Sequence, residues 1–262
     1  MQPVSLSATL VVRDLSRAVQ FYASAIGLEV VGHEPGMTAM GAGGAAFLRL
    51  RHDPGALPDD PGGAGLFHLA FLLPTRADLG GWLRHGDGAG LRLDGAADHL
   101  VSEAAYLHDP EGNGIEVYAD RPPGAWAWDG GGVRMANDRL DHAGLRAEAA
   151  HWRGAPAGTR LGHVHLRVGD VPAAVRFCTE RLGLQVTRQW PEAAFLSWKG
   201  YHHHVAVNTW RSAGAHPRPA GLSGLQEVTV RAQAGTLPTT EATLHDPWGV
   251  AIHIETTNTG DA

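Results

Sequence analysis

The sequence holds a single cysteine, Cys178, among its 262 residues. One cysteine cannot form an internal disulfide, and such sparing use is typical of proteins in a reducing compartment. The chain also lacks an apolar run long enough to cross a membrane, and Met1–Pro3 does not begin a secretory leader. These absences exclude a disulfide-stapled secreted domain, and they predict a cytoplasmic protein with no membrane partner.

Positive charge is not in excess either. The chain has 21 Lys and Arg residues against 27 Asp and Glu residues, which gives a formal net charge of −6. A surface that binds nucleic acid needs the opposite balance, so no nucleic-acid partner is predicted. Hydrophobic residues at 44% and charged residues at 18% are ordinary for a globular protein of one large domain or two smaller ones. Histidine is frequent, with 16 residues.

An internal repeat with a constant offset of 156 organises the chain. Residues 8–30 read ATLVVRDLSRAVQFYASAIGLEV, and residues 164–186 read VHLRVGDVPAAVRFCTERLGLQV. Each copy predicts a strand, a helix and a second strand. The positions identical in the first and second copies are Leu10, Val12, Asp14, Ala18, Val19, Phe21, Gly27, Leu28 and Val30.

Helix signals support this interpretation of the repeat. Asp14 and Asp170 stand where a helix N-cap is expected, and Gly27 and Gly183 stand where the helix should end.

A second repeat is weaker. Residues 107–112, LHDPEG, return as residues 244–249, LHDPWG. The chain therefore divides into four units that start near residues 5, 65, 161 and 222, the last of them shortened to strands. We expect an α+β fold of four βαβββ-like modules.

The four modules predict two domains joined by a linker. Residues 1–121 form the expected N-terminal domain, and residues 161–262 form the C-terminal one. Residues 122–160 open with Arg-Pro-Pro-Gly and predict a linker, with a helix over residues 137–151. A further helix is expected over residues 76–85.

One stretch between residues 99 and 116 carries ionisable groups at fixed intervals. His99 and Tyr106 precede a Pro/Gly/Asn turn at residues 109–114, and Glu116 follows on the returning strand between Ile and Val. A carboxylate on an apolar strand is costly to bury unless it has a partner.

These features resemble the vicinal oxygen chelate superfamily, which includes glyoxalase I, bleomycin resistance proteins and extradiol dioxygenases. The pattern His99…Tyr106…Asp-Pro-x-Gly-x-x-x-Glu116 is similar to the extradiol ring-cleavage motif. Ala97 and Ala105 depart from it at packing positions. Residues 65–71, 162–166 and 200–206 resemble the two-domain catechol 2,3-dioxygenase branch in particular. The resemblance implies curved mixed sheets around a metal-centred cavity.

The resemblance also implies a metal site of two histidines and one carboxylate. It places His68 and Glu116 in the second module as metal ligands, with His163 from the third. The matching position in the first module is Ser7, which is a poor ligand. The set of three is complete only if the second and third modules face each other.

A rival set stays open. The fourth module carries Glu227 near the position of His68 and His253 at the position of Glu116. With His163 they would also supply two histidines and one carboxylate.

Each candidate also has a purely structural interpretation, because a single histidine on an apolar strand is more often a hydrogen-bonded core residue.

The resemblance assigns catalytic roles to three further residues. His203, within the run His202–His204, aligns with an acid–base histidine, although a register slip would bring His202 or His204 to the same place. Tyr106 and His99 would hydrogen-bond a substrate oxygen. Trp190, Trp198 and Trp210 are candidate pocket residues, with core packing as the alternative.

The implied function is a dioxygenase that uses Fe(II), with Mn(II) as the alternative. Its partners would be a small aromatic diol and O2, and the ring would open beside the two hydroxyl-bearing carbons. A homo-oligomer is compatible with the sequence but not specified by it. Two other classes on the same scaffold stay open: a glyoxalase-like isomerase and a non-enzymatic binder of small molecules or antibiotics.

Overall fold

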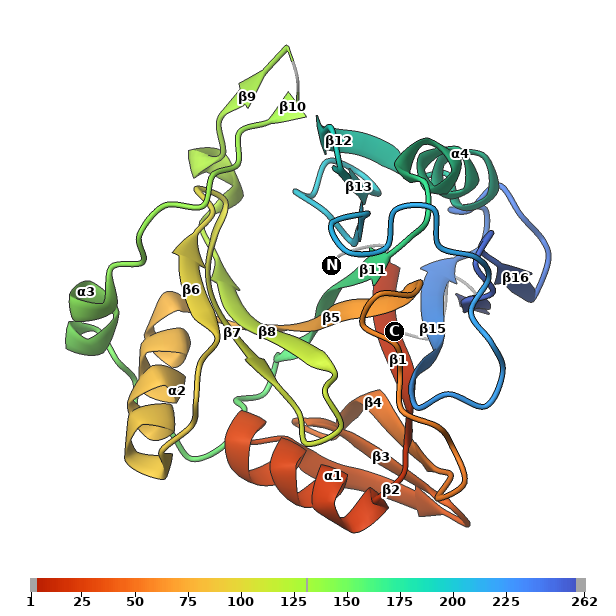
Figure 1. The fold of residues 1–262 in the computed structure, drawn as a ribbon. Coiled ribbons are helices and arrows are strands. Elements are labelled where there is room, and N and C mark those ends of the chain that lie inside the picture. Colours follow the sequence, from red (N-terminus) through yellow and green to blue (C-terminus); the bar gives the residue numbers. More distant parts are fainter. Residues whose placement is uncertain (1–3, 131, 258–262) are drawn as a thin grey trace.

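The computed structural model describes residues 4–130 and 132–257, so the chain start used above, Met1–Pro3, lies outside the described residues. Within these ranges the protein has the predicted α+β fold, in which four related modules build large curved sheets that do not close (Figure 1). Among the helices described, none has the length and apolar character needed to cross a membrane.

The elements follow the module pattern. The first module comprises β1 (Val4–Val12), α1 (Leu15–Phe21), η1 (Tyr22–Ile26), β2 (Glu29–Glu34), β3 (Met37–Ala42) and β4 (Ala45–His52). The second comprises β5 (Gly65–Leu73), α2 (Arg76–Ala89), β6 (Gly95–Asp98), β7 (Ser102–His108) and β8 (Gly114–Asp120). A connecting segment holds η2 (Pro123–Ala125), β9 (Trp128–Asp129), β10 (Gly132–Val133) and α3 (His142–Ala147). The third comprises β11 (Arg160–Arg167), α4 (Val171–Leu182), β12 (Gln185–Trp190), β13 (Ala193–Ser197) and β14 (Val205–Asn208). In the fourth, up to residue 257, the structure describes only β15 (Gly224–Gln233), β16 (Thr243–His245) and β17 (Ala251–Thr257).

The predicted helix boundaries of the repeat are confirmed. The side chains of Asp14 and Asp170 each accept a hydrogen bond from the backbone N–H three residues on, at 3.0 and 2.7 Å, and so cap α1 and α4. Gly27 and Gly183 take left-handed conformations with φ of 79° and 68°, and each ends its helical segment.

The helix predicted over residues 137–151 is wrong in length, because only the six-residue α3 forms there. Asp141 caps its start by accepting the backbone N–H of Gly144 at 2.9 Å. Beyond its end, the backbone N–H of Ala150 donates to the carbonyl of Ala77 on α2 at 2.8 Å. The connecting segment thus satisfies its backbone against a neighbouring helix rather than by continuing its own.

The helix α2 runs four residues past the predicted end at residue 85. It continues to Ala89 and ends where Gly90 adopts a φ of 68°. A glycine on its inner face, Gly80, allows the connecting segment to approach closely, because a Cβ there would lie 2.1 Å from the carbonyl oxygen of Leu145.

The modules pair in a nested order. β5 of the second module runs antiparallel to β11 of the third, and β1 of the first runs antiparallel to β15 of the fourth. We call the strands of modules two and three the inner sheet, in the order β6-β7-β8-β5-β11-β14-β13-β12. The outer sheet, from modules one and four, has the order β2-β3-β4-β1-β15-β17-β16.

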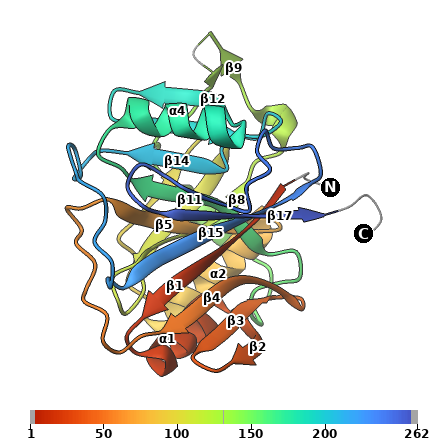
Figure 2. The same cartoon turned by 90° about the vertical axis from the view of Figure 1, so that its right-hand side faces the viewer.

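This pairing joins strands from both sides of the division expected between residues 121 and 161. The two sheets meet at one bridge, between Leu6 of β1 and Leu161 of β11. Figure 2 shows β1, β15, β11 and β5 crossing the centre of the molecule side by side.

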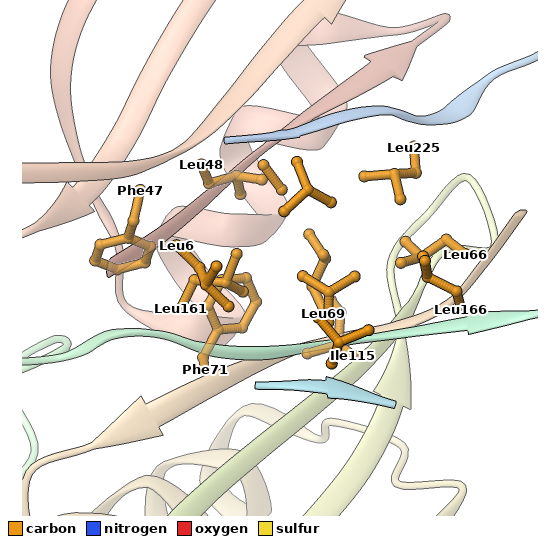
Figure 3. Close-up of a cluster of buried hydrophobic side chains, with 14 of the residues drawn as sticks. Leu6, Phe47, Leu48, Leu66, Leu69, Phe71, Ile115, Leu161, Leu166 and Leu225 are labelled. Carbon is orange, nitrogen blue, oxygen red and sulfur yellow. The ribbon is translucent and has the colours of Figure 1, made fainter. Parts of the chain in front are cut away.

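The main core lies between the two sheets. On β5 the alternate residues Leu69, Phe71 and Leu73 point into it, as do Ile115 and Val117 on β8. Figure 3 shows Leu69, Phe71 and Ile115 facing Leu48 and Leu6 of the first module. Because side chains alternate along a strand, the residues between them are turned to the opposite, concave face of the inner sheet.

Candidate metal centre and cavity

The strand register of the inner sheet gathers three candidate residues around one alanine. Ala70 on β5 lies beside Glu116 on the parallel strand β8 and beside His163 on the antiparallel strand β11. His68 is two residues earlier on β5 and shares the concave face. Ala70 is fully buried and carries only a methyl group, so the three longer side chains can converge above it.

Three donor atoms converge at this place. The His68 Nε2 lies 3.0 Å from Glu116 Oε2, and the His163 Nε2 lies 3.3 Å from the same oxygen. The two Nε2 atoms are 3.4 Å apart, and all three residues are buried. The second and third modules therefore meet as the candidate set requires.

The triangle of donor atoms suits a single divalent ion. Ligand atoms about 2.1 Å from one ion, at the angles of common coordination geometries, lie roughly 3.0–3.4 Å from each other. Two imidazoles and one carboxylate on one face leave the opposite positions open, which is the donor set of non-haem iron oxygenases. The Nδ1 of His163 is buried without a hydrogen-bond partner among the described residues.

The protonation states also suit a ligand set. Burial lowers the pKa of His163 to about 4, although the negative charge of Glu116 opposes the shift, so the imidazole is neutral at neutral pH. Burial raises the pKa of Glu116, but the combined interactions with His163 and His68 outweigh it and hold that pKa well below the usual range. Metal ions bind neutral imidazole and ionised carboxylate.

The rival set does not assemble. Glu227 accepts a hydrogen bond from Thr9 at 3.1 Å, and the ring of His253 lies 3.2 Å from the hydroxyl of Thr243. Both residues belong to the outer sheet and are only partly buried. Among the described residues, the one cluster of three potential ligands is His68, Glu116 and His163.

The turn before β8 sets the position of Glu116. Asp109 accepts the backbone N–H groups of Glu111 and Asn113 at 2.8 and 2.9 Å, which folds residues 109–113 into a tight reversal. A Cβ at Gly114 would lie 2.1 Å from the carbonyl oxygen of Phe67. This glycine therefore allows the backbones at the start of β8 and on β5 to approach closely.

A cavity of about 350 Å³ opens above the three donor atoms. Its buried floor includes the three residues with His165, Phe195 and His203. The remaining lining residues are Phe67, Gly95, Ala96, Ala97, His99, Tyr106, Met135, Asn137, Trp190 and Trp210. Strands of both modules and the connecting segment thus contribute to one chamber. Figure 1 shows the strands β6–β8 and β12–β13 that supply part of its lining.

Tyr106 and His99 both line the cavity and are hydrogen-bonded to each other. The Tyr106 hydroxyl lies 2.5 Å from the His99 Nε2, and the His99 Nδ1 lies 2.8 Å from the carbonyl oxygen of Ala136. A carbonyl only accepts, so Nδ1 carries the proton and Nε2 accepts the proton of Tyr106. Burial, followed by the charge of Glu116, raises the pKa of Tyr106 well above its usual value, so the phenol stays protonated.

Of the three consecutive histidines, His203 alone lines the cavity. Its Nδ1 lies 2.7 Å from the Nδ1 of His202, whose Nε2 lies 2.8 Å from a carboxylate oxygen of Asp120. Asp120 accepts a proton from His202, so His202 in turn accepts from His203. We call the hydrogen-bonded series Asp120–His202–His203 the histidine chain. It fixes the tautomer of His203 in which Nε2 is unprotonated.

Burial, and then the neighbouring His163 and His202, lower the pKa of His203 well below the usual value. The imidazole is therefore neutral and can accept a proton. His204 points elsewhere, and its Nδ1 accepts the backbone N–H of Trp198 at 3.3 Å.

His165, which the motifs left without a role, lies on the cavity floor two residues after His163. The amide oxygen of Asn208 accepts the backbone N–H of Trp210 at 3.2 Å, which turns the amide nitrogen toward the His165 Nε2 at 2.9 Å. Nε2 is therefore an acceptor that is already used, and His165 does not join the ligand cluster. The period-2 spacing from His163 was the available signal for its place on the concave face.

The three candidate tryptophans lie in two different environments. Trp190 and Trp210 line the cavity, whereas Trp198 is buried in the core and donates its indole N–H to the carbonyl of Leu182 at 2.8 Å. Asp120 and Met135 were not anticipated, because one lies at a strand end and the other in a connecting segment.

Comparison with known proteins agrees with this architecture. Residues 5–117 and 160–240 match the model of the Glyoxalase/Bleomycin resistance protein/Dioxygenase superfamily. The catechol-2,3-dioxygenase of Bacillus subtilis (strain 168) is 40% identical to this chain over 231 residues, which span 85% of the chain and 80% of that relative.

Solved structures show the same fold. Glyoxalase I from Zea mays aligns with a TM-score of 0.56 at 16% identity, over 96% of this chain and 92% of that one. The cppA protein from Streptococcus pneumoniae TIGR4 aligns with a TM-score of 0.60 at 12% identity, over 97% of each chain. With the family model matching most of its length and a relative at 40% identity, the chain belongs to the Glyoxalase/Bleomycin resistance protein/Dioxygenase superfamily.

Proposed function

We propose that the protein is an extradiol dioxygenase that cleaves the ring of a catechol-type diol with O2. The observation that carries the proposal is the buried triangle of His68, Glu116 and His163 at the floor of a cavity large enough for an aromatic ring. Two histidines and one carboxylate leave room for both diol oxygens and O2. The similarity to a protein named catechol-2,3-dioxygenase supports the same reaction class.

The three residues would hold Fe(II), with Mn(II) as the alternative. When bound, such an ion supplies Lewis acidity that lowers the pKa of the diol hydroxyls and brings the diol and O2 into contact. The neutral imidazole of His163 and the ionised carboxylate of Glu116 are ready to bind without first losing protons at neutral pH.

The other cavity residues would manage protons. A diol that enters must release a hydroxyl proton, and the unprotonated Nε2 of His203 can accept it. The contact from His203 through His202 to Asp120 then stabilises the positive charge that develops. Tyr106, with its proton directed to His99, offers an oxygen acceptor to a substrate hydroxyl and holds the ring in one orientation.

The test is anaerobic loading of the purified protein with Fe(II), followed by catechol and air. We expect a yellow ring-opened product and one bound metal per chain. A matched pair of variants, His68→Ala in the cluster and His253→Ala in the outer sheet, should separate a specific site from incidental binding. Activity and metal content should be lost only in the first. Protein that binds Zn or Ni, or no metal at all, and leaves catechol intact would contradict the proposal.

A further inference from the structure

The cavity has a polar floor and a mainly apolar mouth, at which Asn137 is an exposed polar residue. The donor atoms of His68, Glu116 and His163 are buried at the floor. Two aromatic pairs also line the cavity, and Phe67, Trp190 and Trp210 are partly exposed at its mouth, whereas Phe195 belongs to the buried floor. Phe67 and Trp210 meet edge to face with ring centroids 5.2 Å apart, and Trp190 and Phe195 do so at 5.0 Å.

Most of these mouth residues remain partly exposed, and Trp210 is 44% accessible. Met135 from the connecting segment adds a further half-buried apolar side chain. When an apolar ligand covers exposed aromatic surface around a pocket, the burial of that surface favours binding.

The size of the cavity exceeds what a single ring needs. A cavity of about 150 Å³ is enough to hold benzene. The volume here is about 350 Å³, so a diol ring at the floor leaves space for a substituent about as large as a second ring. Small residues, Gly95, Ala96 and Ala97 on β6, keep one wall open. The diol oxygens must face the floor, so the substituent would lie among the aromatic residues of the mouth.

The charge of the lining restricts the substituent further. Among the described residues that line this cavity there is no Lys or Arg, and Glu116 is the one carboxylate. The lining therefore offers no cationic side chain to a carboxylate on the substrate, and burying an unpaired charge near Glu116 is costly.

An adjoining hollow of about 380 Å³ does contain arginines, and it shares Phe67, His68, Tyr106 and Trp210 with the cavity. One of its two arginines, Arg167, is already held by the carboxylate of Asp59 at 2.5 Å and by the carbonyl of Gly63 at 2.9 Å. The other, Arg211, is exposed to solvent. The hollow therefore offers no buried, unpaired cation to a substrate anion.

From this geometry we infer that the enzyme selects catechols with an uncharged apolar substituent, aryl in size, and discriminates against carboxylated catechols. The inference rests on the proposed function for the diol end of the substrate. For the substituent end of the substrate, the inference is supported independently by the apolar residues at the mouth of the cavity.

The first experiment uses the metal-free protein, so that it does not depend on turnover. Binding of 2-hydroxybiphenyl, phenol and salicylate is measured by calorimetry and by quenching of tryptophan fluorescence. We expect 2-hydroxybiphenyl to bind at least about tenfold tighter than phenol, and salicylate to bind most weakly. Equal affinity for all three, or preference for salicylate, would overturn the inference even if the protein cleaves catechol.

The second experiment compares kcat/KM of the Fe(II)-loaded enzyme for 3-phenylcatechol, catechol and 2,3-dihydroxybenzoate, in that expected order. Trp190→Ala should reduce the value for 3-phenylcatechol about tenfold more than the value for catechol. Trp128→Ala removes a tryptophan that is 50% exposed on β9 outside the cavity, and it should leave the ranking unchanged. Failure to cleave any of the three contradicts the proposed function, whereas cleavage with 2,3-dihydroxybenzoate as the best substrate contradicts only the selectivity.

Discussion

The outer sheet repeats the strand register of the inner sheet with different residues. Thr229 of β15 lies beside His253 of β17 and Ser7 of β1, in the same relation that Ala70 bears to Glu116 and His163. The position of His68 is taken by Glu227, two residues before Thr229, and Glu227 is bound to Thr9 instead. These outer residues are partly exposed except Thr229, whereas the inner ones are all buried.

The contrast between the two sheets shows that the strand register alone does not create a cluster of potential metal ligands. Both sheets bring a first strand and a last strand of one module beside the first strand of its partner. A ligand cluster arises only where those positions carry His, Glu and His around a small residue. In the part of the fourth module that the structure describes there is no helix, and Met135 and Asn137 of the connecting segment line the cavity of the inner sheet.

Removing the inner carboxylate should have the largest effect. In Glu116→Gln, two imidazoles remain without the anionic ligand, so we expect Fe(II) affinity to fall by more than about 100-fold. Elemental analysis after dialysis measures the bound metal, and product absorbance measures ring cleavage. The matched change in the outer sheet, His253→Ala, should keep full metal content. Equal losses in both variants would mean that the ion does not sit in the inner sheet.

Filling the space at the alanine should have the next largest effect. Ala70→Leu inserts three heavy atoms beneath the converging side chains, so it should displace at least one donor atom and lower stability by about 1–3 kcal/mol. Metal content and thermal unfolding together report the result. Thr229→Val, at the equivalent outer position, is the control and should bind metal normally. A leucine variant with intact metal binding would show that Ala70 does not space the ligands.

Breaking the histidine chain should have a smaller effect, confined to the rate. Asp120→Asn removes the carboxylate that accepts from His202, so the tautomer of His203 is no longer fixed and its developing positive charge is less stabilised. We expect kcat to fall about 10–100-fold with KM and metal content little changed. A variant with unchanged kcat across the pH range would remove His203 from the proton-transfer role.

The effect with the least consequence for metal binding and activity is a pH dependence of stability in the metal-free protein. His163 has a pKa of about 4 in the folded state against 6.5 for an unperturbed histidine. Below pH 6.5 the unfolded chain binds a proton that the folded chain does not. Stability should therefore fall by about 3 kcal/mol as the pH drops from 6.5 to 4, and this contribution should then level off. Urea unfolding of the parent and of His163→Asn measures it, and identical slopes in this window would contradict the assignment.

Much of the fold was predictable because its signals are local. Asp14 and Asp170 cap helices and Gly27 and Gly183 end them, and each of these signals acts within one turn of its helix. The helix expected over residues 137–151 failed because the competing hydrogen bond, from Ala150 to α2, is formed with a distant part of the chain.

The pairing of modules also depends on contacts between residues that are distant in the sequence. The sequence therefore showed only that the ligand set requires the second and third modules to face each other. For the candidate site, too, the residues with local signals could be predicted and those that depend on distant contacts could not. Glu116 and His68 could be named from strand alternation and from the resemblance. The environment of His203 could not, because Asp120, which His203 reaches through His202, lies more than 80 residues away in the sequence. The apolar mouth likewise combines residues of β12, β5 and the connecting segment, whose proximity only the folded sheet creates.

The nested pairing of the modules has a consequence for synthesis of the chain. Every residue of the candidate centre and of the histidine chain precedes Asn208, the last residue of β14. The strands that complete the outer sheet, β15 to β17, begin at Gly224. A nascent chain can thus assemble its candidate centre while the fourth module is still inside the ribosome, and β15 afterwards pairs with β1 of the first module.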